Sequence, residues 1–267
     1  MIMTLKKKPD LTDVSRTMRR KLPILVSRPH GSTHVPSTIR EDMVLADKDI
    51  TDYADLFTDR IFDIPQTYMV TADVSRLVVD LNRAPDHIIA QAELSYEGVV
   101  AAVTDHGKKI FQHPPNLKTI KNWIRNYHHP YHRRIKQCAP KVKFFIDGHS
   151  MHPFGPEQKP DAGKPRADIV LGNREYTTCS LATTTYVAKF FKSKGHSVKI
   201  NDPYAGKYIL GSYCSRHRLP GIQIEVNKGL YLDIKTLKPK KGMIEKLNAE
   251  MTELIYRLLT EHLKVKM

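Results

Sequence analysis

The stretch Lys143-Phe144-Phe145-Ile146-Asp147-Gly148-His149-Ser150 indicates the fold class of this chain. Its apolar half is typical of a buried β-strand, and an acid, a glycine and a histidine stand where the strand is expected to end. Asp147 and His149 are two residues apart, so in a strand their side chains point to the same face. An imidazole beside an orienting carboxylate, at the carboxyl end of a strand, is typical of metal sites in α/β enzymes.

The composition is that of an ordinary globular protein, with 267 residues of which 40% are hydrophobic and 27% are charged. This length fits a single catalytic domain, expected over 22–267, after a basic N-terminal tail over 1–21. No apolar stretch is long enough for a membrane span, and the tail lacks the features of a secretory signal. Cys138, Cys179 and Cys214 have neither disulfide-type nor zinc-type spacing, so we expect a cytoplasmic protein.

The net charge of +15 is the extreme feature of the composition. A positive field attracts nucleic acid, anionic surfaces or small acidic substrates. The basic residues fall into three separate runs, over 5–20, 118–143 and 235–246, rather than along one stripe. No nucleic-acid recognition motif accompanies them, so the expected partner is a small anionic substrate. The sequence specifies no oligomeric state.

Hydrophobic periodicity predicts strands that alternate with helices. This order indicates an α/β fold, a single-domain three-layer α/β/α sandwich with a mixed, largely parallel sheet. A long loop over 153–165, next to His149, is expected to be either a lid or a plain surface excursion. The predicted strands cover 22–27, 67–72, 76–81, 143–147, 168–172, 197–201 and 222–226. The predicted helices cover 51–63, 116–136 with a break or kink at Pro130, 180–194 and 242–262.

Several polar residues fall at the ends of the predicted strands, where ligands bind in such sheets. A lone histidine there is commonly a satisfied structural residue, but two imidazoles and one carboxylate make the usual three-ligand set of a catalytic zinc. Glu225 stands in an otherwise apolar strand, so it must be paired, bound to metal or catalytic. A salt bridge to Arg83 is the structural alternative. The polar residues at strand ends are His30, Asp80, Asn82, Arg83, Asp147, His149, Asp202 and Glu225.

The order of these motifs resembles that of the zinc carboxypeptidases and, more closely, of their N-formylglutamate amidohydrolase relatives. The resemblance spans residues 24 to 232. One matching segment would be weak evidence for the family, but seven in the same order are strong evidence. The matching segments are SRPHG (27–31), VDLNR (79–83), YHHPYH (127–132), DGHSM (147–151), DIVLG (168–172), NDPY (201–204) and IQIEVN (222–227).

The resemblance implies a phosphorylase/hydrolase-like fold of the zinc-exopeptidase type. It also implies hydrolysis of the amide between a formyl or other small acyl group and an amino acid, with N-formyl-L-glutamate as the first substrate to consider. Carried over to this chain, it implies zinc ligation by His30 and His149.

The third ligand departs from the carboxypeptidase pattern, which has a glutamate three residues after the first histidine. This chain has Thr33 at that position. The acidic segment over 55–62 resembles that of the family, and we take Asp55 as the third ligand. Asp59 and His34 are the alternatives.

The resemblance also implies roles for other residues. Glu225 would accept a proton and pass it to the leaving nitrogen. One of the clustered His128, His129 and His132 could donate to the developing oxyanion, and we choose His129; surface histidines on a kinked helix are the alternative. Arg83 would bind the substrate α-carboxylate as a planar fork, with Asn82 beside it. The further substrate-binding candidates are Tyr204 and Lys228.

Two departures bear on the substrate. Lys207 stands where the family pattern has the second glycine of an Asp-Pro-Tyr-x-Gly-Gly-Tyr segment. Lys228 stands where an arginine usually follows the Glu-x-Asn run. A dicarboxylate substrate needs a second cation, for which Lys207, Lys228, Arg166 and Arg216 are candidates. The rival functions are a carboxypeptidase, another N-acyl amino acid deacylase, or an inactive basic protein that binds nucleic acid.

Overall fold

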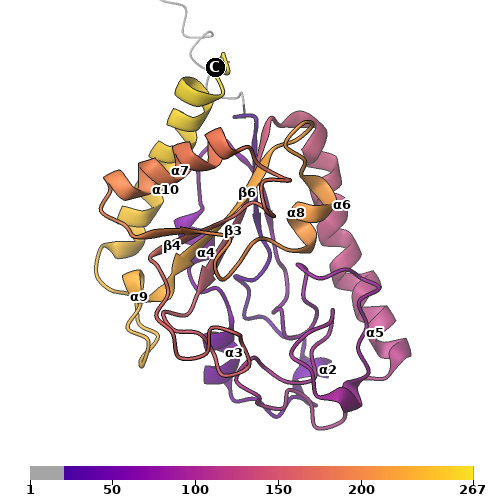
Figure 1. The fold of residues 1–267 in the computed structure, drawn as a ribbon. Helices are drawn as coiled ribbons and strands as arrows, with labels where there is room; N and C mark the ends of the chain where they lie inside the picture. Colours follow the sequence, from indigo (N-terminus) through magenta and orange to yellow (C-terminus); the bar gives the residue numbers. More distant parts are fainter. Residues whose placement is uncertain (1–20, 267) are drawn as a thin grey trace, which may run out of the picture.

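The computed structural model describes residues 21–266 (Figure 1). The predicted basic tail over 1–21 lies outside the described residues, apart from Lys21. Among the described residues, none of the helices is both long enough and apolar enough to cross a bilayer.

Six strands form one mixed sheet in the order β2-β1-β3-β6-β4-β5. The first four strands in this order are parallel to one another, and β4 and β5 run antiparallel to them. The predicted mixed, largely parallel sheet is therefore confirmed. The strands are β1 (Ile24–Arg28), β2 (Tyr68–Thr71), β3 (Phe144–Met151), β4 (Ile169–Gly172), β5 (Val198–Ile200) and β6 (Gly221–Asn227).

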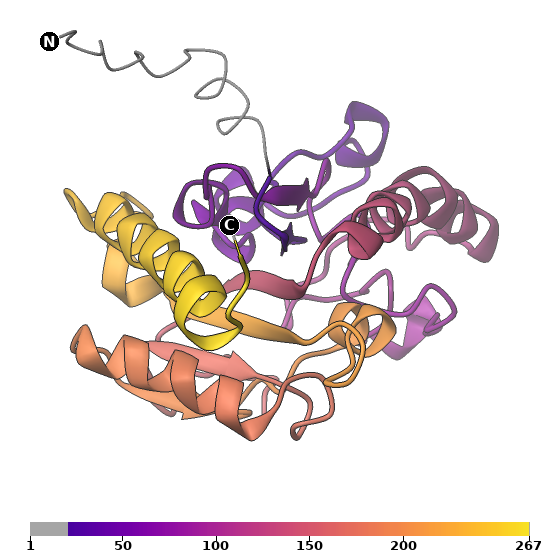
Figure 2. The same cartoon turned by 90° about the horizontal axis from the view of Figure 1, so that it is seen from above.

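Helices cover both faces of the sheet, as Figure 2 shows from above, with α7 and α10 on one side and α6 on the other. The short helices α2 and α3 lie among the loops at the carboxyl end of the parallel strands (Figure 1). The α-helices are α2 (Ser37–Arg40), α3 (Asp47–Tyr53), α4 (Thr58–Ile61), α5 (Leu117–Trp123), α6 (His129–Cys138), α7 (Leu181–Ser193), α8 (Tyr208–Tyr213), α9 (Lys228–Tyr231) and α10 (Met243–Arg257). Single 3₁₀ turns cover Gln91–Glu93 and Ala139–Lys141, and π-helical turns cover Ile124–His128 and Leu258–His262.

The alternation of side chains along β3 determines which face carries the polar residues. Phe144 and Ile146 pack in the core that includes α7 and α10, whereas Phe145 packs in the core that includes α6 and α8. Asp147 and His149 follow Phe145 at intervals of two, so they lie on the α6 side of the sheet. The apolar start of the strand is buried between helices, and its polar end reaches the loops.

The predicted helix over 51–63 is wrong, because the chain leaves the helical conformation at Ala54 and resumes it at Thr58. The backbone N–H of Asp55 donates to the carbonyl of His30 (2.9 Å), and the Thr58 hydroxyl donates to the carbonyl of Asp55 (2.7 Å). These two bonds hold Asp55 against the end of β1. Tertiary contacts therefore override the local helical pattern.

The predicted strand over 76–81 is also wrong, because this segment forms turns. Leu77, Val78 and Val79 are buried in the core on the α6 side. Their backbone bonds go elsewhere, since the N–H of Val78 donates to Ser75 and the N–H of Asp80 donates to Val99. The apolar run correctly predicted that these side chains are buried, but it did not predict the backbone conformation.

The proline at position 130 does not end the predicted helix over 116–136. A π-helical turn joins α5 to α6, and Pro130 is the second residue of α6. A wider turn accommodates a residue that has no N–H and whose ring crowds the preceding carbonyls. The remaining predicted strands and the helices over 180–194 and 242–262 are confirmed within a few residues.

Candidate active site

The candidate site lies at the carboxyl ends of three neighbouring parallel strands. In the sheet register, Ser27 of β1 pairs with Asp147 of β3, and His149 of β3 pairs with Glu225 of β6. Gln223, which precedes Glu225 by two residues, pairs with Asp147. Paired residues in adjacent strands point to the same face, so these side chains form one polar row across the sheet.

A cavity of about 300 Å³ opens over this row. This volume is at the lower end for sites that bind small molecules. Its floor is acidic and rich in imidazole, and its outer walls come from the loops around 76–105, 159 and 203–207. The predicted site residues that line it are His30, Asp55, Asn82, Arg83, His149, Tyr204 and Glu225.

His30, Asp55 and His149 form the centre of the floor, and all three are buried. One ligand atom from each lies within 4.8 Å of the other two. Asp55 Oδ2 lies 3.7 Å from His30 Nδ1 and 3.2 Å from His149 Nδ1. The alternatives for the third ligand, Asp59 and His34, are exposed and do not line the cavity.

The second ring nitrogen of each histidine lies beside a carboxylate. His30 Nε2 donates to Asp80 Oδ1 (2.8 Å), and Arg76 donates to the other oxygen of Asp80 (2.8 Å). His149 Nε2 lies 3.1 Å from Asp147 Oδ2. On His30, a proton on Nε2 leaves the lone pair of Nδ1 unshared, as metal ligation requires, whereas His149 Nδ1 is hydrogen-bonded to Asp55 Oδ2 at 3.2 Å.

Asp147 is supported in turn from the interior of the sheet. The Ser27 hydroxyl donates to Asp147 Oδ1 (2.8 Å) and lies 2.7 Å from the hydroxyl of Tyr131 on α6. Ser27, Tyr131 and Asp147 are all buried. This chain of contacts runs from Tyr131 on α6 through Ser27 on β1 to Asp147 on β3, which lies beside His149. The orientation of His149 therefore depends on segments that are far apart in the sequence.

The electrostatics of this group suit a divalent cation. Burial lowers the pKa of His30, which favours the neutral imidazole that binds metals. Burial also opposes the charged form of His149, but Asp147, Asp55 and Glu225 outweigh it and hold its pKa well above the ordinary value. His30 Nδ1 is buried without a hydrogen-bond partner among the described residues. An unpartnered nitrogen beside an excess of buried carboxylates fits a zinc-type set of ligands.

Glu225 faces the same group from β6. Its Oε1 accepts a hydrogen bond from Gln223 Nε2 (2.8 Å), which fixes the orientation of the carboxylate. Burial raises its pKa above the ordinary value, and the neighbouring His149 acts in the opposite direction. The structural alternative, a salt bridge between Glu225 and Arg83, is absent among the described residues, since the carboxylate partners of Arg83 there are Asp80 and Glu97. A buried carboxylate with a raised pKa is suited to proton transfer.

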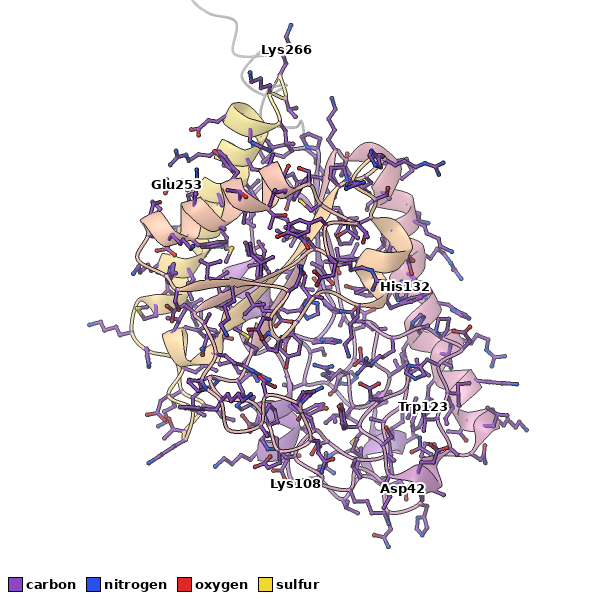
Figure 3. The ribbon with its side chains drawn as sticks, viewed as in Figure 1. Asp42, Lys108, Trp123, His132, Glu253 and Lys266 are labelled. Carbon is purple, nitrogen blue, oxygen red and sulfur yellow. The ribbon has the colours of Figure 1, made fainter. Side chains whose placement is uncertain are left out.

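Two histidines, His128 at the end of the π-helical turn and His132 of α6, hold the backbone that carries Asn82 and Arg83. His128 Nε2 donates to the carbonyl of Arg83, and His132 Nε2 donates to the carbonyl of Leu81, each at 2.9 Å. His132 lies between α6 and α8 (Figure 3), with its other nitrogen 2.9 Å from the Tyr213 hydroxyl. These bonds fix the backbone at 81–83, from which the Arg83 side chain reaches the cavity.

The structure corrects the expectation for His129. Residues four positions apart share a helix face, and here His128 and His132 point inward. His129 is exposed and does not line the cavity. It cannot donate to an oxyanion formed over His30 and His149.

Three of the four candidates for a second cation also lie outside the cavity. The buried amine of Lys228 donates to the carbonyl of Asp52 (2.6 Å). Arg166 is paired with Asp161 (2.7 Å) and stacks over Tyr204, and Arg216 is exposed elsewhere. Lys207 is the candidate that lines the cavity.

The sequence reasoning missed several residues that complete the site. Gln223 could have been found, because it precedes Glu225 by two residues and therefore shares its strand face. Ser27 and Arg76 carried no comparable signal. Lys159 comes from the predicted loop over 153–165, which forms one wall of the cavity.

The chain is similar to proteins of known function over most of its length. A model of the N-formylglutamate amidohydrolase family matches residues 22–232. N-formylglutamate deformylase of Pseudomonas putida is 23% identical over 235 residues, covering 80% of this chain and 83% of that protein. The protein of the same name from Pseudomonas aeruginosa is 23% identical over 263 residues, covering 93% and 97%. The crystal structure of an N-formylglutamate amidohydrolase from Ralstonia eutropha JMP134 superposes with a TM-score of 0.79 at 25% identity, covering 90% of this chain and 93% of that one.

Proposed function

This chain belongs to the N-formylglutamate amidohydrolase family, and from that premise we propose that it hydrolyses N-formyl-L-glutamate to formate and L-glutamate. The observation that carries the proposal is the buried group of His30, Asp55 and His149, which shares one cavity with Glu225 and Arg83. The names of the relatives in both Pseudomonas species support the same substrate.

We propose that His30, Asp55 and His149 hold zinc. When bound, such a metal supplies a Lewis acid that polarises an acyl carbonyl and lowers the pKa of water. Asp80 and Asp147 keep the two imidazoles in the tautomer and orientation that ligation requires.

Glu225 is the residue that moves the proton. Its carboxylate takes a proton from the attacking water as the oxygen bonds to the formyl carbon, and it then gives that proton to the amino nitrogen as the C–N bond breaks. The Gln223 amide holds one carboxylate oxygen throughout, so the other is free to face the reacting atoms. Formate and the free amino acid result.

Arg83 binds the α-carboxylate of the substrate. Its side chain is largely buried, and its nearest carboxylate contacts are long, at 3.4 Å to Glu97 and 4.0 Å to Asp80. A guanidinium without a close partner can offer both of its parallel N–H groups to a carboxylate. This anchor orients the acyl group toward the floor of the cavity.

The substrate assignment predicts the outcome of a panel of amides. Purified protein with zinc should release formate from N-formyl-L-glutamate with a kcat/KM at least about 10-fold above that for hydrolysis of N-acetyl-L-glutamate, because the formyl carbon carries no methyl group to crowd the attacking water. Formate release and free amine are measured in parallel. Exclusive release of C-terminal residues from peptides would indicate the carboxypeptidase instead, and RNA binding without turnover would indicate the binding protein.

Ser27→Ala tests whether the hydrogen bond from Ser27 to Asp147 helps to orient the metal ligand His149. Loss of the hydroxyl leaves Asp147 Oδ1 buried and unpaired, so the orientation of His149 is less well defined. We expect zinc affinity, measured by competition with a chelator, to fall about 10-fold. Ser193→Ala on α7 is the control. An unchanged zinc affinity in Ser27→Ala would show that the interior hydrogen bonds do not position the ligand.

A further inference from the structure

Positive charge collects at the outer end of the cavity, opposite the acidic floor. Arg83, Lys159 and Lys207 all line the cavity, and they come from three separate segments of the chain. The floor residues Asp55 and Glu225 are buried, whereas the Lys207 side chain is 41% exposed. A ligand that enters the cavity therefore meets the lysines at its outer end while its inner end faces His30 and His149.

The lysines have no close ionic partner among residues 21–266. Lys207 Nζ lies 3.8 Å from Glu97 Oε1, and Arg83 Nη2 lies 3.4 Å from the same oxygen. Within the described part of the chain, Lys159 has no carboxylate within 4.0 Å, and its amine lies over the ring of Tyr96 at 4.3 Å. One carboxylate oxygen is thus shared by two cations, and the third cation rests on an aromatic face.

Both lysines have lowered pKa values, chiefly because burial disfavours their charged forms. Burial, with Arg83 and Lys159 acting in the same direction, lowers the pKa of Lys207 to about 8. Burial also lowers the pKa of Lys159, against the opposing effect of Asp105. Asp80 is already bonded to His30 and Arg76, so the carboxylates left to oppose Arg83, Lys159 and Lys207 are Glu97 and Asp105, and a further anion would be stabilised.

We propose that Lys207 and Lys159 bind a second carboxylate of the substrate, so that the enzyme selects N-acyl derivatives of acidic amino acids. Glu97 competes with that carboxylate for the same cations and weakens its binding. This inference rests on the proposed function, in which Arg83 already binds the α-carboxylate. In this inference, Lys207 and Lys159 determine the selectivity for the amino-acid side chain. The residues at the floor of the cavity determine the selectivity for the acyl group.

The test compares N-formyl-L-glutamate with N-formyl-L-glutamine, which has nearly the same shape but no side-chain charge. In Lys207→Met, the ratio of kcat/KM for the acid to that for the amide should fall about 10-fold, mainly through KM. Lys207→Arg should restore most of the ratio. Glu97→Gln should raise the ratio, since it removes the competing carboxylate.

Lys192→Met is the matched control, because Lys192 is exposed on α7, on the far face of the sheet. It removes the same charge and should leave the ratio unchanged. Equal losses for both substrates in Lys207→Met, or a lower ratio in Glu97→Gln, would overturn this assignment while leaving the proposed function intact. Wild-type protein that hydrolyses neither compound would instead contradict the proposed function, and this inference with it.

Discussion

Glu225→Gln is expected to lower kcat for N-formyl-L-glutamate by about 10²- to 10⁴-fold while zinc content stays at the wild-type level. The amide keeps the shape of the side chain, and its position beside Gln223 is preserved. It cannot accept the proton of the attacking water, so the barrier to both proton transfers rises. Formate release and elemental analysis of the same preparation separate the two effects.

Glu253→Gln is the control for this substitution. Glu253 lies on α10 (Figure 3), does not line the cavity, and pairs with Lys194 at the surface. Its substitution should leave kcat unchanged. A Glu225→Gln protein with wild-type kcat would exclude Glu225 as the proton carrier, and one that loses zinc would indicate that Glu225 is itself a ligand.

His149→Ala is expected to lower both zinc content and kcat by about 100-fold or more. It removes one of three ligands and leaves the buried Asp147 carboxylate without its imidazole partner. Zinc per chain is measured by elemental analysis after dialysis, and His30→Ala should behave in the same way.

His129→Ala distinguishes the sequence-based prediction, in which His129 is catalytic, from the structure, in which His129 is exposed. Its ring is exposed on α6, so both zinc content and kcat should stay at the wild-type level. A large loss of kcat in His129→Ala, with His149→Ala retaining zinc, would mean that the site has been assigned to the wrong residues.

The sequence predicted those parts of the site that lie on regular strands. Asp147, His149 and Glu225 were found because a polar residue in an apolar strand is costly to bury without a function. The period of two then places Asp147 and His149 on one face. The sheet register that brings Glu225 opposite His149 agrees with this reasoning.

The parts that the sequence could not predict depend on contacts between distant segments. Asp55 was expected on a helix, but its backbone N–H bonds to His30 and the helix breaks there. His129 was chosen from a run of histidines whose rotation about the helix axis is decided by packing against 81–83. Lys159 lies in an irregular loop, for which hydrophobic periodicity gives no direction to a side chain.

We propose that the amidohydrolase activity of this protein depends on one metal ion held by His30, Asp55 and His149. Titration of zinc into protein stripped with a chelator, with formate release from N-formyl-L-glutamate as the readout, tests it most directly. We predict activity that is near zero in the stripped protein, rises in proportion to added zinc and stops rising at about one equivalent per chain. Full activity in stripped protein that retains no metal, or no activity at any zinc concentration, would contradict it.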